Sequence, residues 1–166
     1  MATGDELGYN TGASATAMAN AIFGSGVTVI GASYSGDNRS SAIYDNLDGS
    51  GNTISEVAPG DSGVILSTGR ASHFTQRNGD PNRSSGTSTN TSGVNNNADF
   101  NADAGTNTYD ASFLDIDFRA TGDTMTMQFV FASEEYPEYV NSLYQDFVGV
   151  WVNGTQVNMS VGNGDA

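Results

Sequence analysis

The sequence predicts an all-β fold, an antiparallel β-sandwich of the jelly-roll kind with one short N-terminal helix. Short apolar runs alternate with stretches rich in Ser, Thr and Asn, and glycine contributes 21 of the 166 residues. This texture is typical of strands joined by many turns. The length suits a single domain over residues 1–166.

The N-terminal helix is expected over residues 13–24, because Ala and Met favour helix and Gly24 can end it. The apolar runs after it have the length and composition of strands, and an Asn-Gly turn at 153–154 leads into a last one. Strands are expected over residues 26–36, 62–74, 111–120, 123–135 and 146–154.

Two of these strands alternate clearly between apolar and polar residues, as half-buried strands do. In the first, Leu114, Ile116 and Phe118 share one face, and Asp115 and Asp117 share the other. In the second, the apolar face consists of Met125, Met127, Phe129 and Phe131. The turn sequence RATGD between them predicts a β-hairpin.

The chain is strongly acidic, with a formal net charge of −14, and its five basic residues are all arginine. Such a surface repels the phosphates of nucleic acids and of anionic membranes, so neither is an expected partner. The absence of cysteine excludes disulfides and thiolate metal sites, and a single histidine excludes a His-rich zinc site. No apolar run is long enough for membrane insertion. Divalent cations are the natural counter-charge.

Residues 75–108 form a long polar segment, rich in Asn, Ser and Gly, which we expect to be a loop within the domain. Calcium binds six to eight oxygen atoms from carboxylates, carbonyls and water, and this composition supplies such ligands. We therefore expect Ca²⁺ as the ordering cofactor.

A first group of candidate metal ligands follows the apolar run FVFAS. Proline at 137 favours the end of the strand there, so that neighbouring acidic side chains can turn to one site. The alternative is a solvated acidic loop. The candidates are Glu134, Glu135, Glu138 and Asp146.

A second acidic group overlaps the strand expected over 111–120. Two of its members share one strand face, where their charges repel each other unless a cation or hydrogen-bond donors lie nearby. The alternative is an outward, solvated face. The candidates are Asp99, Asp103, Asp110, Asp115 and Asp117.

Two other patterns are weaker. Residues 46–56 resemble an EF-hand loop, but the final Glu falls one residue early and no helices flank it, so a hairpin turn is the better interpretation. His73 lacks a nucleophile-elbow pattern, and no pair of carboxylates is singled out for glycoside hydrolysis. We expect no enzymatic activity.

Three stretches resemble the choice-of-anchor L domain family of secreted bacterial proteins. GVTVIGASYSG is similar to the family's early strand, and SGVILSTG resembles its GIILSTG signature. TYDASFLDIDF and the following FVFASEEYPEYVNSLYQDFVGVWVNG resemble its most specific feature, an Asp-Ala strand followed by FASEEY and DVFGFF. The resemblance covers residues 14–160, and the family's motif positions correspond to Asp110, Glu134, Glu135 and Asp146. Phe147-Val148 departs from the family's Val-Phe order.

The resemblance implies an extracellular domain, tethered to cells by varied C-terminal anchors and without enzymatic activity. We predict a secreted or cell-surface, calcium-binding adhesion module that recognises a protein or glycan. One alternative is a purely structural module, and another is a hydrolase or autoprocessing domain. The family domain continues past the end of this chain, so we also expect strands from a second chain or a neighbouring copy to complete the fold.

Overall fold

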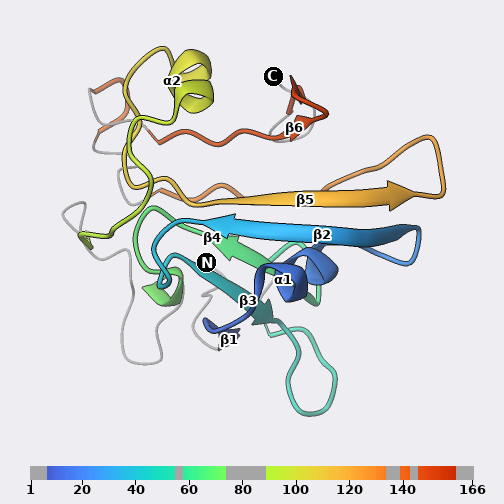
Figure 1. Ribbon diagram of the computed structural model, residues 1–166. Helices are drawn as coiled ribbons and strands as arrows, with labels where there is room; N and C mark the ends of the chain where they lie inside the picture. The colour runs from blue at the N-terminus through green and yellow to red at the C-terminus, as the bar shows by residue number, and fades with distance from the viewer. Residues whose placement is uncertain (1–6, 55–57, 74–88, 134–138, 143–145, 160–166) are drawn as a thin grey trace.

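The computed structural model describes residues 7–54, 58–73, 89–133, 139–142 and 146–159 (Figure 1). These residues form antiparallel strands with two short α-helices, which confirms the predicted antiparallel all-β class. The elements are β1 (Gly8–Asn10), α1 (Ala15–Ile22), β2 (Val27–Ser35), β3 (Ser41–Asp45), β4 (Ser62–Leu66), η1 (a 3₁₀ helix, Ala71–His73), α2 (Ala98–Ala104), β5 (Phe113–Ala120), β6 (Trp151–Val152) and β7 (Thr155–Gln156).

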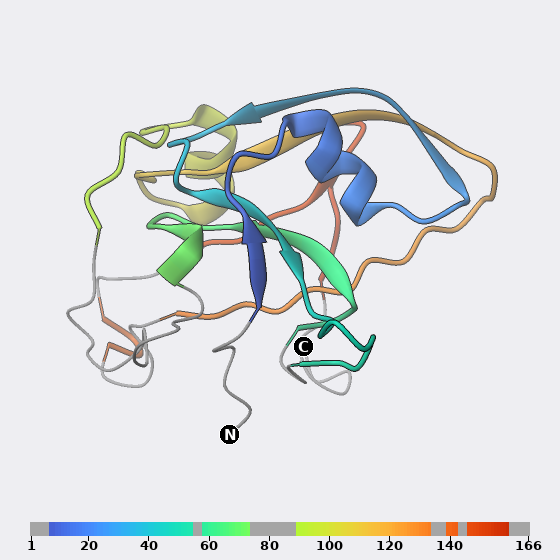
Figure 2. The same cartoon turned by 90° about the horizontal axis from the view of Figure 1, so that it is seen from below.

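The strands of the described residues form three small sheets, ordered β1-β3-β4, β2-β5 and β6-β7, and every pairing is antiparallel. Helix α1 contacts β2 and β5 on one side and β3 and β4 on the other. Figure 2 shows it between β2 and the β1-β3-β4 sheet. Helix α1 thus packs against both of the larger sheets. The jelly-roll strand order stays a prediction.

Helix α1 confirms the helix expected over residues 13–24. The Ser14 hydroxyl caps its N-terminus by accepting the Ala17 amide at 3.2 Å, which satisfies one of the free amides of the first turn. Met18 and Ala19 are buried, and Phe23, just past the helix, packs on Phe118 with ring centroids 5.0 Å apart. This packing anchors the helix to β5.

Strands β2 and β5 pair along most of their length, with one β-bulge in β2. Val29 lies opposite Phe118 and Gly31 opposite Asp117, so Ile30 is an extra residue whose side chain is 66% exposed. The predicted faces of β5 are confirmed. Its apolar residues are half-buried, and Asp115 and Asp117 are exposed.

The predicted hairpin between 111–120 and 123–135 is wrong in the described residues, because β5 pairs only with β2 and residues 124–133 form no strand. The amide and hydroxyl of Thr121 both donate to the Gly26 carbonyl, at 2.9 and 3.1 Å, which ties the end of β5 to the start of β2. The chain then leaves the sheet. Residues 124–133 have no assigned strand and run away from β5, as the long orange trace in Figure 2 shows.

Two further strand predictions were too long. The strand expected over 62–74 ends at Leu66, because Ser67 and Ala71 donate their amides to Ser40 and Arg39 rather than continuing the ladder. In the strand expected over 146–154, only Trp151–Val152 pairs, in a hairpin with β7. Its Asn-Gly turn is confirmed, with φ of 51° at Asn153 and 74° at Gly154.

The segment expected to be a loop over 75–108 contains α2 in its described part. The Asn97 side chain caps this helix by accepting the amides of Asp99 and Phe100, and Gly105 ends it in the left-handed conformation at φ 68°. The helix is short and none of its residues is buried, so it produces no apolar periodicity in the sequence.

The most deeply buried residues surround β3 and α1. The apolar ones are Leu7, Met18, Ala19, Ala42, Tyr44 and Ala71. Four polar residues are buried with them: Asp37, Ser40, Ser41 and Asn46. Buried polar groups are costly unless they are hydrogen-bonded, so a polar network is expected in this region.

Candidate functional site

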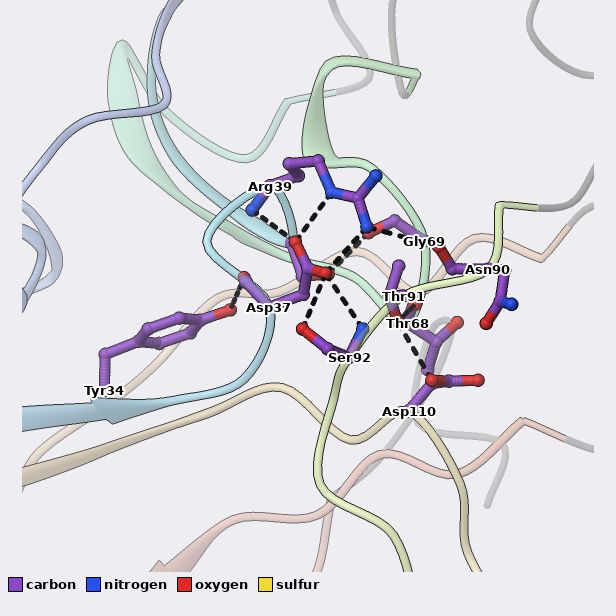
Figure 3. Close-up of polar contacts among 10 residues, drawn as sticks. Tyr34, Asp37, Arg39, Thr68, Gly69, Asn90, Thr91, Ser92 and Asp110 are labelled. Carbon is purple, nitrogen blue, oxygen red and sulfur yellow. Dashed lines mark hydrogen bonds and ion pairs between the residues drawn. The ribbon is translucent and has the colours of Figure 1, made fainter.

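A buried carboxylate dominates the connection between β2 and β3. Asp37 is only 4% exposed. The amide and Nε of Arg39 donate to its Oδ1 at 2.9 and 2.8 Å, and Nη2 of Arg39 donates to its Oδ2 at 2.7 Å. The Ser92 amide and hydroxyl also donate to Oδ2, at 2.9 and 3.0 Å (Figure 3). We call Asp37, Arg39 and Ser92 the Asp37 clamp.

The Asp37 clamp is an internally neutralised ion pair. The Arg39 guanidinium, then the Ser92 and Arg39 amides, hold the pKa of the Asp37 carboxyl far below its usual range. The carboxylate in turn raises the pKa of Arg39. Both carboxylate oxygens already accept at least two donors, so few lone pairs are left for a metal ion or for proton transfer. The clamp therefore holds chain segments together.

The segments it holds are far apart in the sequence. Ser92 belongs to residues 89–96, which lie within the polar segment 75–108. Arg39 Nη2 also donates to the Asn90 carbonyl of this stretch, at 3.2 Å. The Arg39 carbonyl accepts the Ala71 amide of η1 at 2.9 Å. One arginine thereby ties the β2–β3 connection to two other loops.

A row of hydroxyl groups extends the site toward β5. The Tyr34 hydroxyl lies 2.8 Å from the Asp37 carbonyl and 3.0 Å from the Ser112 hydroxyl. The Ser112 hydroxyl donates to the Ser40 carbonyl at 3.2 Å, and the Ser40 hydroxyl donates to the Gly69 carbonyl at 2.6 Å. Gly36, at φ 154°, makes room for this row, because a Cβ there would lie 2.5 Å from the Tyr34 hydroxyl.

Asp110, one of the predicted site residues, lies beside this network (Figure 3). The Thr91 hydroxyl lies 3.0 Å from Asp110 Oδ1 and 2.9 Å from the Thr68 carbonyl. The Asp110 amide donates to the Asn95 side chain at 2.8 Å, and its φ of 53° turns the chain into β5. Asp110 thus helps to fasten the segment 89–96 onto the body of the domain.

The other predicted acidic residues are dispersed. Asp115 and Asp117 line a shallow hollow on the outer face of β2 and β5, together with Gly31, Ala32, Ser33 and Ile116. Asp99 lies in the first turn of α2, and Asp103 accepts the Trp151 indole N–H at 2.9 Å. Asp146 accepts the Ser133 hydroxyl.

Metal ligation therefore has no assembled centre in the part of the chain that is described: no group of three or more acidic or histidine side chains meets there. Glu134, Glu135 and Glu138 lie outside the described residues. The calcium prediction stays a prediction.

The EF-hand-like stretch closes on itself. Asp48 Oδ1 accepts the amides of Ser50 and Asn52, each at 2.8 Å, and the Asn52 side chain donates to Oδ2 at 3.0 Å. These donors, the Asn52 side chain first, lower the pKa of the Asp48 carboxyl. Because Leu47 bridges to Thr53 and β3 pairs with β4, the hairpin interpretation of this stretch agrees with the structure.

Sequence reasoning missed all three residues of the Asp37 clamp. One signal was available. Asp37 and Arg39 flank a single residue directly after an apolar strand, and the chain has only five basic residues for 19 acidic ones. A scarce arginine next to an acidic residue at a strand end is a candidate for a buried pair.

Comparison with known proteins gives one finding. Residues 9–165 match the family model of the Choice-of-anchor L domain, which is nearly the whole chain. No curated protein and no solved structure matches. None of the helices in the described ranges has the length and apolar content that a membrane crossing requires. The chain therefore belongs to the choice-of-anchor L domain family, a family of bacterial surface-associated or secreted modules.

Proposed function

We propose that the chain is a non-enzymatic recognition module of a larger bacterial surface or secreted protein, which adheres to a protein or glycan ligand and which calcium stabilises. One observation carries the recognition part of this proposal. Met125, Met127, Val130 and Phe131 are 45%, 49%, 49% and 47% exposed within a single short stretch. Exposed apolar residues that gather in one region mark interaction surfaces on soluble proteins.

A second observation, in the buried network, is consistent with a non-enzymatic role. Among the carboxylates of the described residues, Asp37 has the most strongly lowered pKa, and donors from its own chain saturate it, so it is poorly placed to act as an acid, base or nucleophile. Family membership is consistent with this role, because surface modules present ligand-binding faces to the outside.

Arrays of glycans and of bacterial and host surface proteins test the proposal. We expect the labelled domain to bind a definable subset, and the double variant Met127→Ser/Phe131→Ser to lose that binding. The matched control is Ile30→Ser, which removes a similarly exposed apolar side chain on the β2 bulge, outside the stretch. Absence of any ligand for the wild type, or equal loss in the control, would contradict the proposal.

Calcium stabilisation has its own support in the net charge of −14 and in carboxylates such as Asp115 and Asp117 on an exposed strand face. A ligand that binds only the native state stabilises it by about 2.7 kcal/mol at a hundredfold excess over its dissociation constant. For a domain of this length that free energy corresponds to a rise in melting temperature of roughly 5–10 °C.

Thermal unfolding in millimolar calcium, in millimolar magnesium and in EDTA measures this effect. We expect calcium alone to raise the melting temperature. Equal melting temperatures in calcium and EDTA would remove calcium from the proposal and leave the recognition surface unaffected.

A further inference from the structure

We infer that residues 124–132 accept an extended, basic segment of a partner protein as an added β-strand. The inference rests on the proposed function, because it names the class of ligand that the exposed apolar stretch recognises.

The backbone of this segment is the first observation. In the described part of the structure, no hydrogen bond joins residues 124–132 to any other residue. Each of these nine residues carries one amide donor and one carbonyl acceptor, and there is no proline among them. A free row of such groups is the template to which another strand adds.

The side chains are the second observation. The sequence TMTMQFVFA alternates with the period of a strand and contains residues that favour strands. Met125, Met127 and Phe131 are exposed, and they would share one face if the segment were extended as a strand. Methionine adapts its shape to varied partners. A segment of nine residues spans about 30 Å when extended, long enough for several alternating contacts.

Charge selects the partner. The segment itself is uncharged, but Asp123 precedes it and two glutamates follow it in the sequence, within a chain of net charge −14. A second copy of the chain would bring the same charge and would be repelled. A partner strand that carries Lys or Arg at its ends is attracted to these acidic residues, whereas a second copy of the chain is repelled by them.

Synthetic peptides test the inference directly. The probe is a fluorescent peptide of alternating Val and Thr with two lysines at each end, and its first control carries glutamates in place of the lysines. The second control is N-methylated at alternate residues, which removes the donors of one peptide edge and keeps the side chains. We expect the lysine peptide to bind, each control to bind at least tenfold more weakly, and high salt to weaken binding.

A chain variant completes the experiment. Val130→Pro removes one backbone donor in the segment, and we expect it to abolish peptide binding without lowering the melting temperature, because the segment has no strand partner in the fold. Light scattering of the domain without peptide is expected to show a monomer.

Each of the following outcomes would overturn the inference: no binding, equal binding of lysine and glutamate peptides, full binding of the N-methylated peptide, or a dimer that Val130→Pro dissociates. The last would assign the segment to a second copy. A ligand found on the arrays whose binding survives Val130→Pro would leave the proposed function standing and refute this inference alone.

Discussion

The region around the Asp37 clamp and the segment 124–132 differ in how far their backbone and side-chain groups are hydrogen-bonded and buried. Around the clamp, the β2–β3 connection, η1 and residues 89–96 exchange hydrogen bonds through one arginine, one carboxylate and a row of hydroxyls. Residues 124–132 have the clearer strand pattern in the sequence, yet they form no hydrogen bond in the described structure.

The difference shows that local strand pattern and stability come from different sources in this chain. The clamp region is stabilised by long-range contacts among loops, which bury small residues and satisfy buried polar groups. The segment 124–132 has favourable local propensity but leaves its apolar side chains exposed. Its free backbone groups and side chains are therefore available to a partner.

The largest effect is expected in the packed region. Met18, on α1, is 1% exposed and lies between the two larger sheets. Met18→Ala should lower the free energy of unfolding by about 2–5 kcal/mol, because it removes buried contacts and leaves a cavity. Urea denaturation measures the change. A loss below about 0.5 kcal/mol would mean that α1 is not the shared packing element of the two sheets.

An intermediate effect is expected at the clamp, and it should depend on pH. The donors around Asp37 lower its pKa from the ordinary value of 3.8, so at acidic pH the unfolded chain binds a proton that the native chain does not. The clamp's stabilisation is complete above about pH 4 and is lost as the pH falls below that value. The Asp37→Asn variant lacks this carboxyl and should melt below the wild type at neutral pH.

Melting curves of both proteins from pH 7 to pH 2 measure this dependence. The gap in melting temperature should be constant between pH 7 and pH 5 and should narrow below pH 4. Arg39→Gln removes the main cause of the lowered pKa of Asp37. In chains that carry Arg39→Gln, the melting-temperature difference caused by adding Asp37→Asn should therefore depend less steeply on pH. A gap that stays the same down to pH 2 would show that the Asp37 carboxylate contributes no charge-dependent stability.

The sequence predicted those parts of the fold whose signals are local. The helix at 13–24, the faces of β5 and the Asn-Gly turn depend on caps, alternation and turn residues, and each is confirmed. Strand partners depend on the whole chain. The choice of β2 rather than 123–135 as the partner of β5 involves Thr121 and Gly26, which are 95 residues apart in the sequence.

For the same reason the candidate site was only partly predictable. The acidic cluster in the sequence included Asp110 as a candidate metal ligand, which stays a prediction, and in the structure Asp110 hydrogen-bonds to Thr91 beside the clamp. Asp37 was missed because its burial follows from the return of Ser92 across 55 residues. In the sequence alone, Asp37 with Arg39 two positions away looks the same as a solvent-exposed acidic residue, because only the folded chain buries it.

The smallest effect is expected from a methionine in the segment 124–132, for comparison with Met18 in the packed region. Met127 is 49% exposed, whereas Met18 is 1% exposed, so Met127→Ala removes little buried contact. It should change the free energy of unfolding by less than about 0.5 kcal/mol, measured by urea denaturation beside Met18→Ala. If Met127→Ala costs as much as Met18→Ala, the side chain is buried in solution. The contrast between the two regions would then be lost, because residues 124–132 would be a strand of the domain's own core rather than a free surface.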